Sequence, residues 1–327
     1  MNSAVAQGNN LWYVGDGVKK GMYVTYKIQD QDTNAGRPFD MTIYFKDYNN
    51  TGKYWVAPTF IVDGGRVING TLYLSDLDLT ALGSSKIPPE MNKYRSGYSN
   101  SLKWLSAYVA KPGQSLSSQS WGKIASIGGS EIKPSGKAKI TVPGGTFDTT
   151  VITYHKGVDN HIWVKDGFPY PVKAQTYADI TTGNPPVQFA FDLLSTGQGQ
   201  PKQPESKEEI AVPPLEQRTE RGTYIIHLTW TPVTIKTGNN TEFGIIFYDN
   251  DKTNILTDVG YTFSVLDSKT QQLIYGKDNQ LAPDGTAKQN VIFQKPGPAT
   301  VKVLITTAGS GAPSNFVETG QFDIVVQ

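Results

Sequence analysis

Apolar residues return at every second position along most of the chain, and this alternation predicts β-strands. It is clearest between Gly136 and Leu194, where Gly, Pro and Asn mark the gaps and three or four antiparallel strands are expected. One predicted hairpin turns at residues 157–160. The same pattern predicts earlier strands in a meander at residues 22–28, 39–45, 53–62 and 67–74. We therefore expect a mainly β chain whose N-terminal part is an antiparallel curved sheet, a half-barrel.

One segment departs from this alternation and predicts a helix at about residues 90–109. Its apolar residues recur at three- and four-residue steps. Pro89 suits a first helical turn, and the pair Pro112-Gly113 ends the helix. The apolar face must pack on the sheet, where it either seals a core, which is the commoner role, or covers a ligand cavity. In the second case the ligand-binding residues are Trp55, Phe60, Tyr94, Tyr98, Leu102 and Leu105.

The alternation stops after Leu194 and returns at Thr223. Residues 196–221 are rich in Pro, Gly and charged side chains and predict a linker. Seven short alternating blocks follow, with turns between them, which is typical of an immunoglobulin-like (Ig-like) β-sandwich. The predicted organisation is a curved β domain with its helix at residues 1–195, the linker at 196–221 and the sandwich at 222–327.

Composition excludes several classes of protein. The 30 basic and 29 acidic side chains give a formal charge of +1, so no broad field attracts nucleic acid. The absence of cysteine excludes disulfides, thiolate metal sites and a cysteine nucleophile. The sequence contains no run of eighteen apolar residues, so it does not predict an integral membrane protein.

Several features favour an extracellular or cell-surface location. Residues 2–10, after Met1, form a polar lead of the kind left on a mature exported protein once its signal peptide is removed. Three sequons, at Asn49, Asn69 and Asn239, are compatible with glycosylation after export, although each is equally an ordinary turn asparagine.

Metal sites have weak support in the sequence. Asp30, Asp32 and Asn34 place oxygen ligands at alternate positions, which suits calcium, but the spacing departs from the calcium-loop pattern and favours a plain turn. His155 and His161 flank the 157–160 turn and would need a third ligand to hold zinc; two solvent-exposed histidines are the better interpretation. Blue copper is excluded from the second domain, which has one His and neither Cys nor Met.

Acidic turns of the second domain offer one more calcium candidate. Asp249, Asp251 and Asp258 are close in sequence, between two of the predicted strands. Acidic turns in sandwiches are mostly turns without a metal, and we favour that interpretation.

Two stretches resemble known families. Residues 142–148, read as Val-Pro-Gly-Gly-Thr-Phe-Asp, together with Phe-Pro-Tyr-Pro-Val-Lys at 168–173 and Phe-Asp-Leu-Leu at 191–194, resemble the closing half of LolA-like curved-sheet domains of exported proteins. That resemblance implies a cradle for a lipid or other hydrophobic ligand. The segments 247–249, 259–265 and 291–303 resemble Ig-like modules in surface proteins of ammonia-oxidising archaea, which implies a structural module on a cell surface.

The sequence contains no Gly-x-Ser-x-Gly, no His-Glu-x-x-His and no phosphate-binding loop. We therefore expect a non-enzymatic extracytoplasmic surface protein with a structural, adhesive or assembly role, whose partners are other surface proteins or glycans. One alternative is a carrier for an apolar ligand or lipid in the curved sheet. A second alternative is a carboxylate-dependent hydrolase, because catalytic carboxylate pairs have no fixed spacing in sequence. No cofactor is expected, apart from the calcium candidates.

Overall fold

A computed structural model describes residues 11–124, 129–178, 185–206, 210–309 and 313–327. The chain is mainly β, as the alternation predicts. Its contacts divide it into two compact units. Unit 1 comprises Met1–Asp30, Pro38–Ile87 and Met91–Ser206, and unit 2 comprises Gln31–Arg37, Pro88–Glu90 and Lys207–Gln327. The polar lead at residues 2–10 lies outside the described residues.

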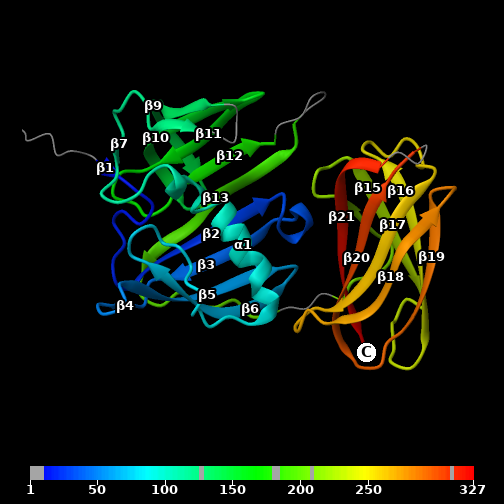
Figure 1. Cartoon of the computed structure of the whole chain (residues 1–327). Coiled ribbons are helices and arrows are strands. Elements are labelled where there is room, and N and C mark those ends of the chain that lie inside the picture. The colour runs from blue at the N-terminus through cyan, green and yellow to red at the C-terminus, as the bar shows by residue number, and fades with distance from the viewer. Residues whose placement is uncertain (1–10, 125–128, 179–184, 207–209, 310–312) are drawn as a thin grey trace, which may run out of the picture. The chain divides into compact units, whose positions relative to one another are not determined.

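Unit 1 is built on one large antiparallel sheet with the strand order β4-β5-β3-β2-β13-β12-β11-β10-β9-β8, while β6 pairs with β5 (Figure 1). Strand β2 joins the early strands to the late ones, because Tyr26 pairs with Met41 of β3 on one side and with Leu193 of β13 on the other. The first seven strands are β1 (Leu11–Trp12), β2 (Met22–Asp30), β3 (Phe39–Tyr44), β4 (Asp47–Asn49), β5 (Tyr54–Asp63), β6 (Arg66–Ser75) and β7 (Gln114–Ser115), which pairs with β1. The later strands are β8 (Gly122–Ile124), β9 (Ser130–Val142), β10 (Gly145–Lys156), β11 (Val158–Val164), β12 (Lys173–Tyr177) and β13 (Val187–Gln198).

The stretch from 136 to 194 contains five strands, β9 to β13, rather than the predicted three or four. Strand β12 was missed because it has only five residues, of which Ala174 and Thr176 are buried. The hairpin between β10 and β11 is tighter than predicted, with Lys156 pairing with Val158 around Gly157.

The predicted helix over 90–109 is wrong in length. A 3-10 turn at Pro89–Met91 leads into α1 (Asn92–Asn100), and a second 3-10 turn covers Trp104–Ala107. The helix ends because Ser101 leaves helical geometry, at φ −118° and ψ −82°, while its hydroxyl donates to the carbonyl of Gly97 at 2.5 Å. A serine that bonds to the preceding turn competes with the helical backbone, and Gly97 weakens the same turn.

The core of unit 1 lies between the sheet and α1, which packs on β2 (Figure 1). Buried Trp12 donates its indole N–H to the carbonyl of Phe168 at 2.8 Å, which ties the start of the unit to the segment after β11. Gly17, at φ +72°, makes that approach possible, since a Cβ there would lie 2.1 Å from the carbonyl oxygen of Gly167.

Unit 2 contains two four-stranded antiparallel sheets, ordered β14-β15-β16-β19 and β18-β17-β20-β21. Side chains from both sheets form one buried cluster, and Phe243 of one sheet lies 5.7 Å from Phe263 of the other, ring centre to ring centre. All seven predicted strands of this unit are present. They are β15 (Tyr224–Thr231), β16 (Asn240–Asp249), β17 (Val259–Asp267), β18 (Leu273–Ala282), β19 (Thr286–Ile292), β20 (Gly297–Thr307) and β21 (Pro313–Val326).

The predicted linker at 196–221 is shorter in the structure, because strands enter it from both ends. Strand β13 continues to Gln198, and an eighth strand of unit 2, β14 (Leu215–Arg218), pairs with β15. The intervening residues 199–206 and 210–214 form no strand. Among the described residues, no helix has the length and apolar character needed to cross a bilayer.

Candidate functional site

The residues predicted to line a cavity under the helix are packed in the core of unit 1. Tyr94, Tyr98, Leu102 and Leu105 are 0–1% exposed and belong to one buried cluster. The hydroxyl of Tyr98 donates to the carbonyl of Leu79 at 2.5 Å and lies 3.0 Å from the hydroxyl of Tyr170. Burial raises the pKa of both phenols well above the ordinary value. These neutral, hydrogen-bonded groups tie the helix to its surroundings.

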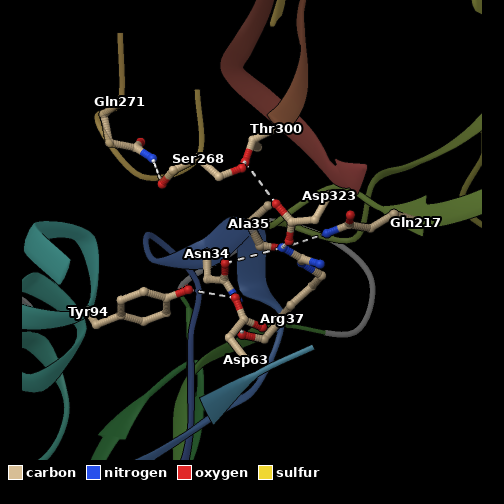
Figure 2. Close-up of polar contacts among 10 residues, drawn as sticks. All are labelled: Asn34, Ala35, Arg37, Asp63, Tyr94, Gln217, Ser268, Gln271, Thr300 and Asp323. Carbon is tan, nitrogen blue, oxygen red and sulfur yellow. Dashed lines mark hydrogen bonds and ion pairs between the residues drawn. The ribbon is translucent and has the colours of Figure 1, made fainter. Parts of the chain in front are cut away.

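Tyr94 is held in the same way, because its hydroxyl donates to a carboxylate oxygen of Asp63 at 2.6 Å (Figure 2). Trp55 and Phe60, expected below the helix, point to different faces of β5. Trp55 packs edge-on against buried Phe45. Phe60 alternates with the buried residues of its strand and lines a separate pocket of about 180 Å³. The structure therefore does not bring Phe60 to Tyr94, Tyr98, Leu102 and Leu105.

The calcium candidates occupy the end of β2 and the turn that follows. Asp30 and Asn34 are buried, whereas Asp32 is exposed. The amide oxygen of Asn34 accepts a hydrogen bond from the guanidinium of Arg37 at 3.3 Å, and a cation already on this oxygen disfavours calcium there. Within the described residues, no group of three or more His, Cys, Asp or Glu is placed to hold a metal ion. Calcium binding by Asp30, Asp32 and Asn34 stays a prediction.

The three sequon asparagines lie in different settings. Asn69 on β6 and Asn239 in a turn are exposed. The side chain of Asn49 is engaged locally, because its oxygen accepts from the backbone N–H of Gly52 at 2.7 Å and its NH₂ donates to Tyr54 at 3.1 Å. Glycosylation at Asn49 would leave its side-chain nitrogen one N–H donor in place of two.

A polar depression of about 420 Å³ lies on the outer face of strands β9, β10 and β11, opposite the core. It is lined by Ser130, Glu131, Lys133, Ser135, Thr153, Tyr154, His155, Asp159 and His161. The strand period of two creates this face, since buried Ile152 and Ile162 alternate with outward Thr153 and His161. We call this depression and the adjoining ring of Trp163 the outer-face site.

The two histidines of the outer-face site have different partners. His155 Nδ1 lies 2.8 Å from a carboxylate oxygen of Asp159, directly across the β10–β11 hairpin. This hydrogen bond holds the pKa of Asp159 below its ordinary value. His161 lies beside Trp163 on β11, with ring centres 5.8 Å apart and planes 27° apart.

Strand register extends the outer-face site across neighbouring strands. Lys133, Thr153, His161 and Gln175 form one row, since each pairs with the next. In the adjacent row Lys173 pairs with Trp163 and places its ammonium 5.9 Å from the Trp163 ring centre. The same ammonium lies 2.9 Å from a carboxylate oxygen of Asp192, and this ion pair fixes one border of the site.

Sequence reasoning identified only part of the outer-face site. It placed His155 and His161 at a hairpin and favoured solvent-exposed side chains over a metal site. The side chain of His155 is exposed, in agreement with that interpretation. It missed Trp163, Lys133 and Glu131. The signal for Trp163 was its position two residues after His161, which puts both rings on the same face of a strand.

A polar cluster in unit 2 joins the turn at Asn34–Gly36 to strand β21. The guanidinium of Arg37 lies 2.7 Å from one carboxylate oxygen of Asp323, whose other oxygen accepts from Thr300 at 2.8 Å (Figure 2). Gln217 donates to the carbonyl of Ala35 at 3.3 Å (Figure 2). These bonds fix a turn whose residues Asn34 and Ala35 have positive φ, a backbone conformation that side chains rarely adopt.

Two carboxylates of unit 2 are withdrawn from solvent. Glu318 is 4% exposed and accepts a hydrogen bond from the hydroxyl of Thr219 at 2.5 Å. Half-buried Glu220 accepts from the backbone N–H of Thr319. Burial raises the pKa of Glu220 to about 7, and the negative charge of Glu318 acts in the same direction.

No known protein-family model matches the chain, and no curated protein sequence matches it. Among solved structures, the soluble domain of PmoD from Methylocystis sp. (strain Rockwell) is similar, with a TM-score of 0.27 and 14% sequence identity. The alignment covers 34% of this chain and 97% of that domain. This is a distant likeness over a third of the chain.

Proposed function

We propose that this chain is a non-enzymatic extracytoplasmic surface protein with a structural or adhesive role. The observation that carries the proposal is the packing of α1 and the turn after it. The four side chains that would line a carrier cavity are 0–1% exposed, and both tyrosine hydroxyls among them are hydrogen-bonded inside unit 1. A helix held in this way supports a sealed structural core better than a lid that opens for a lipid.

The outer-face site supports binding rather than catalysis. Its His155–Asp159 pair has the spacing of a catalytic dyad, but both side chains are about two thirds exposed. An effective dyad needs a buried carboxylate that orients the histidine and a nucleophile within hydrogen-bond reach of it. A shallow polar surface on a rigid sheet favours recognition of an external partner. The resemblance of unit 2 to Ig-like modules of archaeal surface proteins points the same way.

Labelling of intact cells tests the proposal. An antibody raised against the whole chain should label unpermeabilised source cells, and brief protease treatment of those cells should remove the signal. Labelling that requires permeabilisation would contradict a surface role. The carrier alternative has its own measurement: stoichiometric uptake of a fluorescent fatty acid by the purified chain would support it.

A further inference from the structure

The outer-face site combines an aromatic platform with a dense set of hydrogen-bonding groups. Trp163 and His161 lie side by side on one strand and are both only partly covered. Carboxylate, ammonium and hydroxyl groups line the depression beside His161, from Glu131, Lys133 and Thr153. We propose that this face binds a neutral saccharide, an inference that rests on the surface role proposed above and names the partner.

The chemistry of a sugar ring matches both parts of the site. One face of a pyranose carries C–H groups that pack on an aromatic ring, and burying apolar area there is favourable. The rim of the sugar carries hydroxyls that donate and accept. Glu131 and Asp159 can only accept when ionised, Lys133 can only donate, and Thr153 can do both, so the lining matches both capacities of a hydroxyl.

The charges of the site argue against an anionic ligand. Glu131 and Lys133 have opposite charges and lie 3.5 Å apart, and Asp159 adds a second carboxylate beside His155. A phosphate or nucleic-acid backbone would meet these carboxylates, whereas such ligands need a concentration of positive charge. A protein partner is also disfavoured, because protein interfaces depend on apolar anchors buried at their centre and the centre here is polar.

Some polar side chains at the borders of the site already have partners. The His155–Asp159 hydrogen bond and the Lys173–Asp192 ion pair engage four of them. Three interstrand spacings separate Lys133 from Gln175 in the paired row, which gives a platform of roughly 14 Å. Such a platform accommodates more than one sugar ring, and a preformed site loses less conformational entropy on binding.

Titration of the full chain with neutral oligosaccharides tests this assignment. The probes are a mannose trisaccharide, as on glycoproteins, and a β-linked glucose trisaccharide, as in secreted polysaccharides. The trisaccharide that binds more tightly indicates whether the partner is a glycoprotein glycan or a secreted polysaccharide. Saturable binding, followed by calorimetry and by a change in tryptophan fluorescence that Trp163→Ala abolishes, is expected with a Kd of about 1 mM or tighter.

Two variants locate the binding. Trp163→Ala removes the aromatic ring on which the sugar would pack, at a position that faces outward from the sheet. It should weaken saccharide binding about tenfold or more, and Asp159→Asn should weaken it less. His227→Ala is the matched control in unit 2 and should bind as the unchanged chain does. Melting curves of all three variants confirm folding.

Two results would overturn the saccharide site: no saturation by either probe, or undiminished binding by folded Trp163→Ala. Both are distinguishable from failure of the surface role, which the intact-cell labelling measures separately.

Discussion

Glu220 should make unit 2 more stable in mildly acidic than in mildly alkaline solution. Its pKa of about 7 in the folded chain exceeds the ordinary value of 4.5. Between these two pH values the folded state binds more protons than the unfolded state, so stability is full below about pH 4.5 and falls as pH rises to 7. The complete difference is about 3 kcal/mol at 1.36 kcal/mol per pH unit. Screening of a half-buried carboxyl lowers the expected loss to about 2 kcal/mol.

The substitution Glu220→Gln keeps the shape of the neutral carboxyl and cannot ionise. The variant should therefore match the unchanged chain at pH 4 and exceed its free energy of unfolding by about 2 kcal/mol at pH 8. Trp230 reports on this unit because the other five tryptophans precede residue 207. Incorporating 5-fluorotryptophan and following its ¹⁹F signal in urea would measure the unfolding of unit 2 within the whole chain.

The control is Glu216→Gln, because hydrogen bonds from Lys252 and His227 lower the pKa of this exposed glutamate. Its removal should leave the fall in stability between pH 5 and 8 unchanged. If Glu220→Gln and the unchanged chain show the same urea midpoints throughout that range, burial of the Glu220 carboxyl does not control the pH dependence and the reasoning is wrong.

Three further substitutions test the packing. Leu105→Ala should cost about 2–5 kcal/mol of unfolding free energy in a urea melt, since its side chain is 1% exposed. The variant should not take up a fluorescent fatty acid. If the unchanged chain binds the fatty acid and Leu105→Ala abolishes that binding, the carrier is favoured. Tyr98→Phe should cost about 1–3 kcal/mol by leaving the Leu79 carbonyl without this donor, and an unchanged melting temperature would contradict a structural role for that bond. Gly285→Ala should destabilise unit 2 selectively in the ¹⁹F experiment, because its φ is +73° and the new Cβ would lie 1.9 Å from the carbonyl oxygen of Leu256. The control is Gly309→Ala, which is also at positive φ but has open space around it, and which should lower the free energy of unfolding less.

The alternation of apolar residues predicted well which residues form strands, but it predicted poorly which strands pair with one another. The alternation over Met22–Asp30 gives the two faces of β2, but nothing local to it specifies β13 as a partner, because pairing is decided by the collapse of the whole sheet. The helix was overextended for a related reason: Leu102 and Leu105 continue the apolar spacing in 3-10 and turn geometry, where the same buried face is kept without α-helical bonds.

The candidate site was predictable only in part, for a similar reason. The hairpin between His155 and Asp159 is encoded in adjacent residues, so sequence alone brings those side chains together. Lys133 reaches the same surface through β9, and its position depends on the register between β9 and β10, which shifts at Val151. A pocket assembled by register across several strands leaves no contiguous motif to read.

The position of β2 in the middle of the sheet has a consequence for synthesis on the ribosome. Its residue Met22 pairs with Gln198, so one side of this strand stays without its native neighbour until most of unit 1 has emerged. At about 5–20 residues per second, roughly 10–40 s pass between the two strands. During that time β2 presents an open row of backbone donors and acceptors to any extended chain nearby. A factor that occupies nascent strands in that interval would be expected to raise the yield of the native protein more than one that acts after release.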